Sequence, residues 1–202
     1  MSLFITFEGA DGCGKTTQIE LLNKYLQEKG FKTLVTREPG AKGLGEKLRE
    51  ILLNCDGEVS PNCESFLFLA DRAQHVDCVI KPALKDGVIV LCDRHTDSTV
   101  AYQGYGRQLD IEQIKKLNEI AVNGLKPDLT IVFDIDIETS MQRVGKTKDR
   151  MESAGMDFFN RVRNGYLAIA KDEPNRVKVI NAADTIERIH EKVVNEVNLI
   201  GR

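Results

Sequence analysis

The sequence lacks any apolar run that approaches the roughly 18–20 residues needed to cross a bilayer. Its apolar opening, residues 2–7, is too short for the core of a signal peptide, and a glycine-rich segment follows it at once. We therefore expect neither a membrane span nor a secretion signal, and we expect a cytoplasmic location.

The sequence also has no C-x-x-C pair and no excess of positive charge. Its five cysteines are odd in number, which argues against a disulfide framework and a zinc site, so free thiols are expected. The 31 acidic residues slightly outnumber the 28 basic ones, so the overall charge does not indicate a nucleic-acid partner.

Internal repeats, low-complexity tracts and linkers are missing too, so residues 1–202 are expected to form one domain. Short apolar runs alternate with amphipathic segments, which predicts an α/β fold of parallel strands joined by helices. The expected strands cover residues 3–7, 33–36, 88–92, 129–134 and 177–180. The expected helices cover residues 16–29, 45–54, 61–84, 110–123, 138 to about 150, 155–171 and 184–199.

The clearest motif is a phosphate-binding loop between the first strand and the first helix. Its residues are Gly9, Ala10, Asp11, Gly12, Cys13, Gly14, Lys15 and Thr16, which match G-x-x-x-x-G-K-[ST]. Such a loop aims backbone N–H groups at a polyphosphate, its lysine adds a cation for the β- and γ-phosphates, and its threonine hydroxyl can ligate Mg²⁺. The alternative is a chance glycine turn. The motif predicts a nucleoside triphosphate site, without specifying a kinase.

Asp93 and Arg94 directly follow the apolar run of the strand predicted at residues 88–92. A carboxylate at this position is typical of the acid that holds the water shell of the metal, and the arginine could hold a phosphate that is not on ATP. A salt bridge between the two residues is the alternative.

Further candidates follow other strands or lie on a helix. Phe68 and Arg72 are four residues apart and share a helix face, where a ring and a guanidinium could stack on a base and bind its edge. A buried phenylalanine with a surface arginine is the alternative. The stretch 97–107 has short polar groups and glycines and is expected to be a binding loop that enters a helix.

Six segments together resemble bacterial thymidylate kinases in order and spacing, over nearly the whole chain. They are EGADGCGKTT (8–17), TREPG (36–40), DRH (93–95), AYQG (101–104), NGLKPDLT (123–130) and FFNRVRNGY (158–166). The resemblance implies a P-loop NTPase fold with a five-stranded parallel sheet in the order 2-3-1-4-5, flanked by helices and closed by a helical lid at about 142–152. It also implies transfer of a phosphoryl group from ATP to dTMP with Mg²⁺, and a homodimer.

The resemblance further assigns roles to individual residues. Phe68 would stack on thymine, Arg72 would bond its carbonyl edge, and Ser98, Thr99 and Gln103 would complete the contacts. Arg94 and Arg37 would hold the acceptor phosphate near Asp11, and Tyr102 would fill the space that a ribose 2′-hydroxyl needs. Glu38 and Arg49 would line the same pocket, Thr17 would join the phosphate loop, and Ala182 would border the adenine of ATP. Thr16 and Asp93 would serve the metal, Asp93 through water.

The catalytic positive charge must come partly from outside the P-loop, because its variable positions Ala10 to Cys13 carry no cation. The lid stretch supplies Arg143 as the first candidate and Arg150 as the second, with a solvated helix face as the alternative. Cys13 could be a reactive thiol beside a helix N-terminus or a small side chain that fits the loop.

The resemblance therefore implies a thymidylate kinase activity, and two alternative functions stay open. One is a kinase of the same fold that acts on another acceptor. The other is a P-loop switch or ATP-binding regulator without an acceptor, for which a phosphate-holding Arg94 would have no task.

Overall fold

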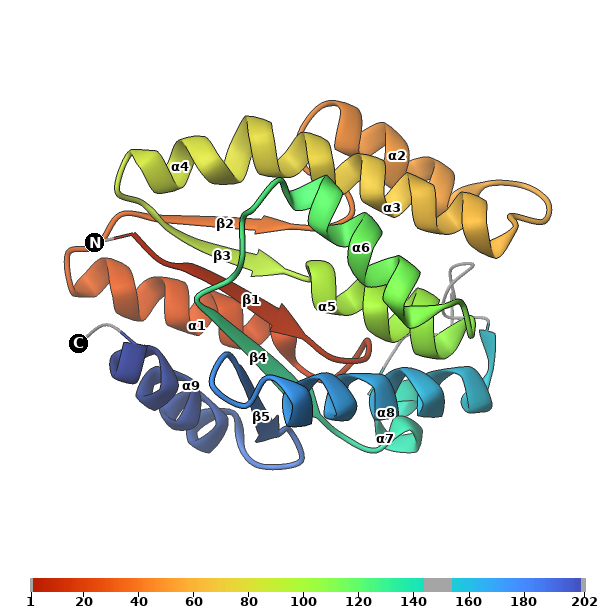
Figure 1. The fold of residues 1–202 in the computed structure, drawn as a ribbon. Helices are drawn as coiled ribbons and strands as arrows, with labels where there is room; N and C mark the ends of the chain where they lie inside the picture. The colour runs from red at the N-terminus through yellow and green to blue at the C-terminus, as the bar shows by residue number, and fades with distance from the viewer. Residues whose placement is uncertain (1, 144–153, 201–202) are drawn as a thin grey trace.

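The computed structural model describes residues 2–143 and 154–200. Its centre is a parallel five-stranded sheet in the order β2-β3-β1-β4-β5 (Figure 1), as the sequence predicted. The strands are β1 (Phe4–Glu8), β2 (Thr33–Arg37), β3 (Ile89–Asp93), β4 (Leu129–Asp134) and β5 (Val177–Asn181). Four of the five end one residue later than the apolar runs predict, because the ladder continues into the first polar residue.

Helices cover both faces of the sheet (Figure 1). They are α1 (Lys15–Glu28), α2 (Leu44–Asn54), α3 (Pro61–His75), α4 (Lys81–Lys85), α5 (Thr96–Thr99), α6 (Ile111–Val122), α7 (Ile137–Arg143), α8 (Met156–Asp172) and α9 (Ile186–Ile200). Two π-helical segments, η1 (Val76–Ile80) and η2 (Val100–Gly106), continue α3 and α5.

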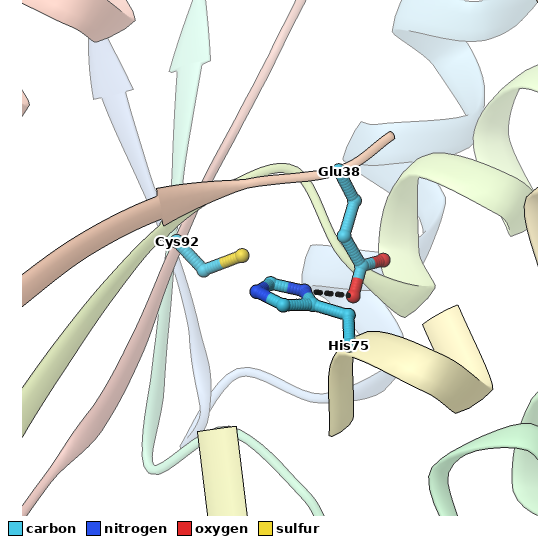
Figure 2. A group of neighbouring side chains, drawn as sticks. All are labelled: Glu38, His75 and Cys92. Carbon is cyan, nitrogen blue, oxygen red and sulfur yellow. Dashed lines mark hydrogen bonds and ion pairs between the residues drawn. The ribbon is translucent and has the colours of Figure 1, made fainter. Parts of the chain in front are cut away.

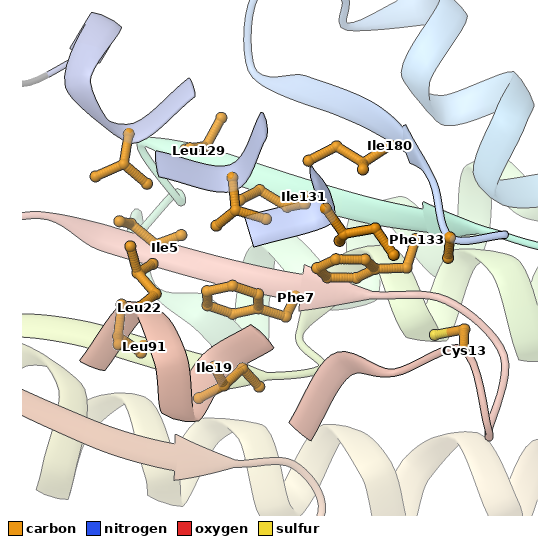
Figure 3. Packing of buried hydrophobic residues seen from close by; sticks show 14 of the residues in the cluster. Ile5, Phe7, Cys13, Ile19, Leu22, Leu91, Leu129, Ile131, Phe133 and Ile180 are labelled. Atoms are coloured by element: carbon orange, nitrogen blue, oxygen red, sulfur yellow. The ribbon is translucent and has the colours of Figure 1, made fainter. Parts of the chain in front are cut away.

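One core lies between the sheet and helices α1 and α9 (Figure 3). Alternate residues of β1, Ile5 and Phe7, point into it, and the ring of Phe7 stacks on that of Phe133 at 6.3 Å between centroids. Burying one such side chain stabilises the fold by about 1.5–3 kcal/mol. The other β1 residues, Phe4, Thr6 and Glu8, therefore point to the opposite face, toward the helices that carry most of the candidate residues.

Two expectations about helices need correction. The stretch 97–107 is mostly helical rather than a loop, since α5 and η2 run from Thr96 to Gly106. The predicted helix 61–84 is one continuous path but changes to π geometry at η1, just before Pro82. Proline has no N–H to donate to the carbonyl four residues earlier, which disfavours regular α-helical bonding there.

Candidate functional site

The carboxyl ends of the central strands meet at one pocket of about 260 Å³. All the predicted acceptor-site side chains line it: Asp11, Arg37, Glu38, Arg49, Phe68, Arg72, Arg94, Ser98, Thr99, Tyr102 and Gln103. The two candidate metal-site residues, Thr16 and Asp93, line it as well. We call this cavity the central pocket. Parallel strands explain the convergence, because their carboxyl ends lie at the same edge of the sheet.

The phosphate loop joins β1 to α1 and depends on glycine geometry. Gly9 has a φ of 134°, and a Cβ there would lie 2.6 Å from the carbonyl oxygen of Phe133. Lys15 lies inside the loop, where its Nζ donates to the carbonyl oxygens of Gly9 and Ala10, each at 3.1 Å. Cys13 is 2% exposed and belongs to the core under α1, which favours its interpretation as a small packed side chain.

A second hollow of about 300 Å³, which we call the P-loop hollow, borders this loop. Gly12, Cys13, Gly14, Thr17, Arg143 and Ala182 are among its lining residues. The structure thus brings Ala182, which follows β5, and Arg143, the last residue of α7, to the glycines of the loop. The other lid candidate, Arg150, lies outside the described residues.

Arg94, which directly follows β3, contacts the P-loop. It adopts a φ of 69°, and its Nη2 donates to Asp11 Oδ1 at 2.8 Å. Although burial raises the pKa of Asp11, the charges of Arg94 and Lys15 lower it to about 2, so the carboxylate is ionised. The Arg94 guanidinium also lies 5.0 Å from the centre of the Tyr102 ring.

The alternative interpretation of Asp93 and Arg94 as a salt bridge is not what the described residues show. Arg94 pairs with Asp11 instead. Asp93 Oδ1 is buried and has no hydrogen-bond partner among the described residues. A buried carboxylate oxygen without a partner is costly, which favours a ligand-binding role for it.

Arg72 is 1% exposed, which contradicts the alternative of a surface arginine. Its Nε donates to Glu38 at 2.8 Å, and its Nη1 donates to Thr99 and Asn118 at 2.6 Å each. Its Nη2 donates to the carbonyl oxygen of His95 at 2.8 Å. These bonds use four of the five N–H groups of the guanidinium, so one has no hydrogen-bond partner within residues 2–143 and 154–200 and can bind a ligand.

Glu38 is the centre of this buried network. Its Oε1 is 2.9 Å from Nδ1 of His75 (Figure 2). The same oxygen is 3.0 Å from Nδ1 of His95, and Oε2 accepts the bond from Arg72. Burial alone would raise the pKa of Glu38, but His95 and Arg72 hold it well below its usual range. Glu38 therefore stays ionised and fixes Arg72 in place.

Glu38, His75 and Cys92 also form a cluster whose ligand atoms lie within 4.8 Å of one another (Figure 2). Burial raises the pKa of the Cys92 thiol well above its usual value, so the sulfur keeps its proton and is a poor metal ligand. The other atoms already have hydrogen-bond partners, including Thr36 on Nε2 of His75 at 2.8 Å. We interpret this cluster as a support for Arg72 rather than a metal site.

Gln103 is held in a similar way. Its Nε2 donates to Glu64 Oε1 at 2.9 Å, and Glu64 also accepts from Arg107. Tyr102 is buried, and its hydroxyl has no hydrogen-bond partner among the described residues. The two side chains enter the central pocket from η2, the segment that the sequence did not predict as a helix.

Five residues that support this site have no role predicted from the sequence. They are Glu8, His75, His95, Asn118 and Tyr166. Glu8 ends β1 and accepts hydrogen bonds from Ser98 at 2.5 Å and from Tyr166 at 2.9 Å. Glu8 and Tyr166 are 158 residues apart, so only the fold brings them together. Glu8, His95 and Tyr166 lie within the segments that carry the family resemblance, and Glu8 is also a polar residue at the end of a buried strand.

A further hollow of about 270 Å³ lies between α5, α6 and α8. Thr96, Val100, Asn118 and Arg176 are among its lining residues, and none of the predicted site residues contributes to it. It lies away from the phosphate loop, so we do not assign the chemistry to it.

The chain is similar to known proteins along nearly its whole length. The family model described as Thymidylate kinase matches residues 7–193. A thymidylate kinase from Geotalea daltonii is 47% identical over 212 residues, with 100% of this chain and 98% of the relative covered. One from Pelotomaculum thermopropionicum is 50% identical over 191 residues, with 93% and 88% covered. A crystal structure of thymidylate kinase from Ehrlichia chaffeensis has a TM-score of 0.81 at 38% identity, with 97% and 98% covered.

Proposed function

Because this chain belongs to the thymidylate kinase family, we propose that it transfers the γ-phosphoryl group of ATP to dTMP and yields ADP and dTDP. The observation that carries the proposal is the central pocket, where Phe68 and Arg72 lie in the same cavity as Arg94 and Thr16 of the P-loop. A base-reading side, a phosphate-binding side and the triphosphate loop thus border one space.

On the donor side, the P-loop amides and Lys15 bind the phosphates of ATP, while Ala182 borders the adenine. Thr16 and Asp93 suit Mg²⁺, since a threonine hydroxyl and a carboxylate are hard oxygen donors, and Asp93 Oδ1 lacks another partner among the described residues. When bound, the metal neutralises charge on the β- and γ-phosphates.

On the acceptor side, Phe68 stacks on thymine, and the remaining N–H of Arg72 donates to a carbonyl of the base. Arg94, with Arg37, binds the acceptor phosphate, and Asp11 keeps the Arg94 guanidinium at the boundary between the two phosphates. One oxygen of the acceptor phosphate then attacks the γ-phosphorus as the bond to the β-phosphate oxygen breaks. Catalysis rests on positioning and electrostatics, without a covalent intermediate.

A coupled assay of ADP release tests the function against a P-loop switch. We expect ATP turnover to require dTMP and to yield one ADP and one dTDP per cycle. A switch or regulator would hydrolyse ATP at the same rate with and without dTMP, and that result would contradict the proposal.

Selection against ribonucleotides gives a second test, which concerns Tyr102. Its buried ring packs edge-on against Phe158 and Phe159 and so has little room to move away from a 2′-hydroxyl. We expect UMP to be a far poorer acceptor than dUMP and the Tyr102→Ala variant to narrow the gap. The ratio of kcat/KM for dUMP to that for UMP measures this preference. Equal use of both by the wild type would rule out the steric role of Tyr102.

The homodimer that the resemblance implies remains a proposal, and exposed apolar residues on neighbouring helices support it. Ile51 on α2, Phe66 on α3 and Ile120 on α6 are 45%, 58% and 76% exposed. We expect a dimer in sedimentation experiments and a monomer for Ile120→Asp. Leu199→Asp, on the exposed surface of α9, is the control that should stay dimeric. A monomeric wild type at micromolar concentration would contradict this assignment.

The single domain, the cytoplasmic location and the absence of a nucleic-acid partner remain predictions from the sequence. The family model spans residues 7–193, which supports a single kinase unit. No helix of the described residues is long and apolar enough to cross a membrane.

A further inference from the structure

Arg94 needs a fixed orientation to bind a phosphate, and its backbone alone does not provide it. The residue lies just beyond β3, in the left-handed region with a φ of 69°. Asp11 holds one end of the guanidinium through Nη2, but Asp11 is itself 40% exposed and lies in the P-loop. This ion pair fixes one nitrogen of the guanidinium, so the orientation of the group also depends on the contacts at its other end.

The other end of the guanidinium has two hydroxyl partners. Nη1 lies 3.3 Å from Ser98 Oγ on α5 and 3.3 Å from the hydroxyl of Tyr166 on α8. Both hydroxyl groups donate to the same oxygen, Oε2 of Glu8, at 2.5 and 2.9 Å. The two hydroxyl oxygens also lie 2.9 Å from each other. A hydroxyl that donates to Glu8 keeps its lone pairs to accept from Arg94.

Glu8 is in turn fixed from several directions. It is fully buried, and its Oε1 accepts the backbone N–H of His95 at 2.7 Å. Burial raises its pKa to about 7, with Asp97 adding to the effect and Ser98, Arg94 and His95 opposing it. Burial also raises the pKa of Tyr166 well above its usual value, so the phenol keeps the proton that it donates.

We infer that Tyr166 and Glu8 are positioning residues that set the Arg94 guanidinium for the acceptor phosphate. The inference rests on the proposed role of Arg94. Neither residue lines the central pocket, and both act through Arg94 and Ser98. Their support joins β1, α5 and α8 behind the phosphate-binding arginine, whereas the network of Glu38 lies behind the base-reading Arg72.

The alternative is that the two hydroxyl groups only satisfy a buried carboxylate and stabilise the fold. Ligands that differ by the phosphate separate these roles. Isothermal titration should compare dTMP with thymidine, which shares the base and sugar but has no phosphate for Arg94. A general loss of pocket structure would weaken the binding of both ligands, whereas a misplaced Arg94 would weaken the binding of dTMP alone.

Tyr166→Phe is the main variant, because it removes only the hydroxyl and keeps the ring that packs 6.4 Å from Tyr102. We expect the Kd for dTMP to rise roughly 5- to 20-fold, near the lower end of the range for a lost hydrogen bond to a charged group because the effect is indirect, while the Kd for thymidine changes less than about twofold. Glu8→Gln keeps the shape but cannot accept all three bonds, and it should show the same selective loss. Tyr25→Phe on α1 is the matched control and should change neither Kd.

Arg94→Ala, measured in parallel, keeps the two proposals distinguishable. If Arg94→Ala leaves the ratio of the dTMP Kd to the thymidine Kd unchanged, the proposed role of Arg94 fails. If Arg94→Ala raises the ratio of the dTMP Kd to the thymidine Kd, but Tyr166→Phe and Glu8→Gln weaken the binding of both ligands equally or of neither, only the positioning inference is overturned. In a double variant that combines Arg94→Ala with Tyr166→Phe, the second substitution should not change the ratio of the dTMP Kd to the thymidine Kd any further.

Discussion

Replacing Arg143 by alanine is expected to lower kcat at least about 10²-fold, because we propose that this side chain supplies positive charge to the transferring phosphoryl group. Arg143 is exposed at the end of α7 and lines the P-loop hollow together with Gly12 and Gly14. The variable P-loop positions from Ala10 to Cys13 carry no cation that could replace it. An isolated arginine finger is worth about 10³–10⁵ in rate, and the lysines of the lid stretch should soften the loss here.

The kinetic signature of this variant separates catalysis from binding. Loss of a contact made only in the transition state lowers kcat and kcat/KM equally. The Kd for dTMP should stay nearly constant, since Arg143 does not line the central pocket. Arg150→Ala is the companion variant, and its neighbour Asp149 predicts a structural pair and a smaller fall. Near wild-type turnover of both variants would contradict a catalytic role for the lid arginines.

Arg72→Ala should reduce kcat/KM for dTMP by about 10²-fold or more while the KM for ATP stays close to the wild-type value. The variant loses the N–H group that we propose donates to the base, and it also leaves Glu38 without its guanidinium partner. Breaking a buried ion pair by removing one partner costs about 3–5 kcal/mol of stability, so the thermal midpoint should fall too.

Phe68→Ala provides the check that does not depend on this buried network. Phe68 is only half-buried and lines the central pocket. Its removal should weaken the binding of dTMP by about tenfold, in line with a lost stacking contact of about 1–3 kcal/mol. It should lower the free energy of unfolding less than Arg72→Ala does. A folded Arg72→Ala or Phe68→Ala variant with unchanged use of dTMP would show that these residues do not read the base.

Much of the fold and site could be predicted because the relevant signals are local. The buried strands are nearly continuous apolar runs, and the P-loop motif lies directly between a strand and a helix. Parallel strands then bring Arg37, Asp93 and the P-loop to one edge of the sheet, whatever the details of packing.

The rest could not be predicted because it depends on contacts between distant segments. The spacing of Phe68 and Arg72 places both on one helix face, but it does not show that Glu38 and His95 meet that face. The pairing of Glu8 with Tyr166 depends on how α8 packs against η2 and the sheet. The glycines and short polar residues of 97–107 resemble a loop, yet tertiary packing holds most of them in helical geometry, where Gly106 allows the Phe158 ring to approach closely.

The acceptor preference of the wild-type protein tests the central claim most directly. Initial rates of ADP release at saturating ATP should be measured with dTMP, dCMP and dGMP under identical conditions. We predict a kcat/KM for dTMP that exceeds the other two by orders of magnitude. Cytosine has an amino group where thymine has the 4-carbonyl that would accept from Arg72, and guanine is a purine and larger than the thymine ring for which the pocket is proposed. Equal activity with all three acceptors would contradict the assignment of the central pocket as a thymine-reading site.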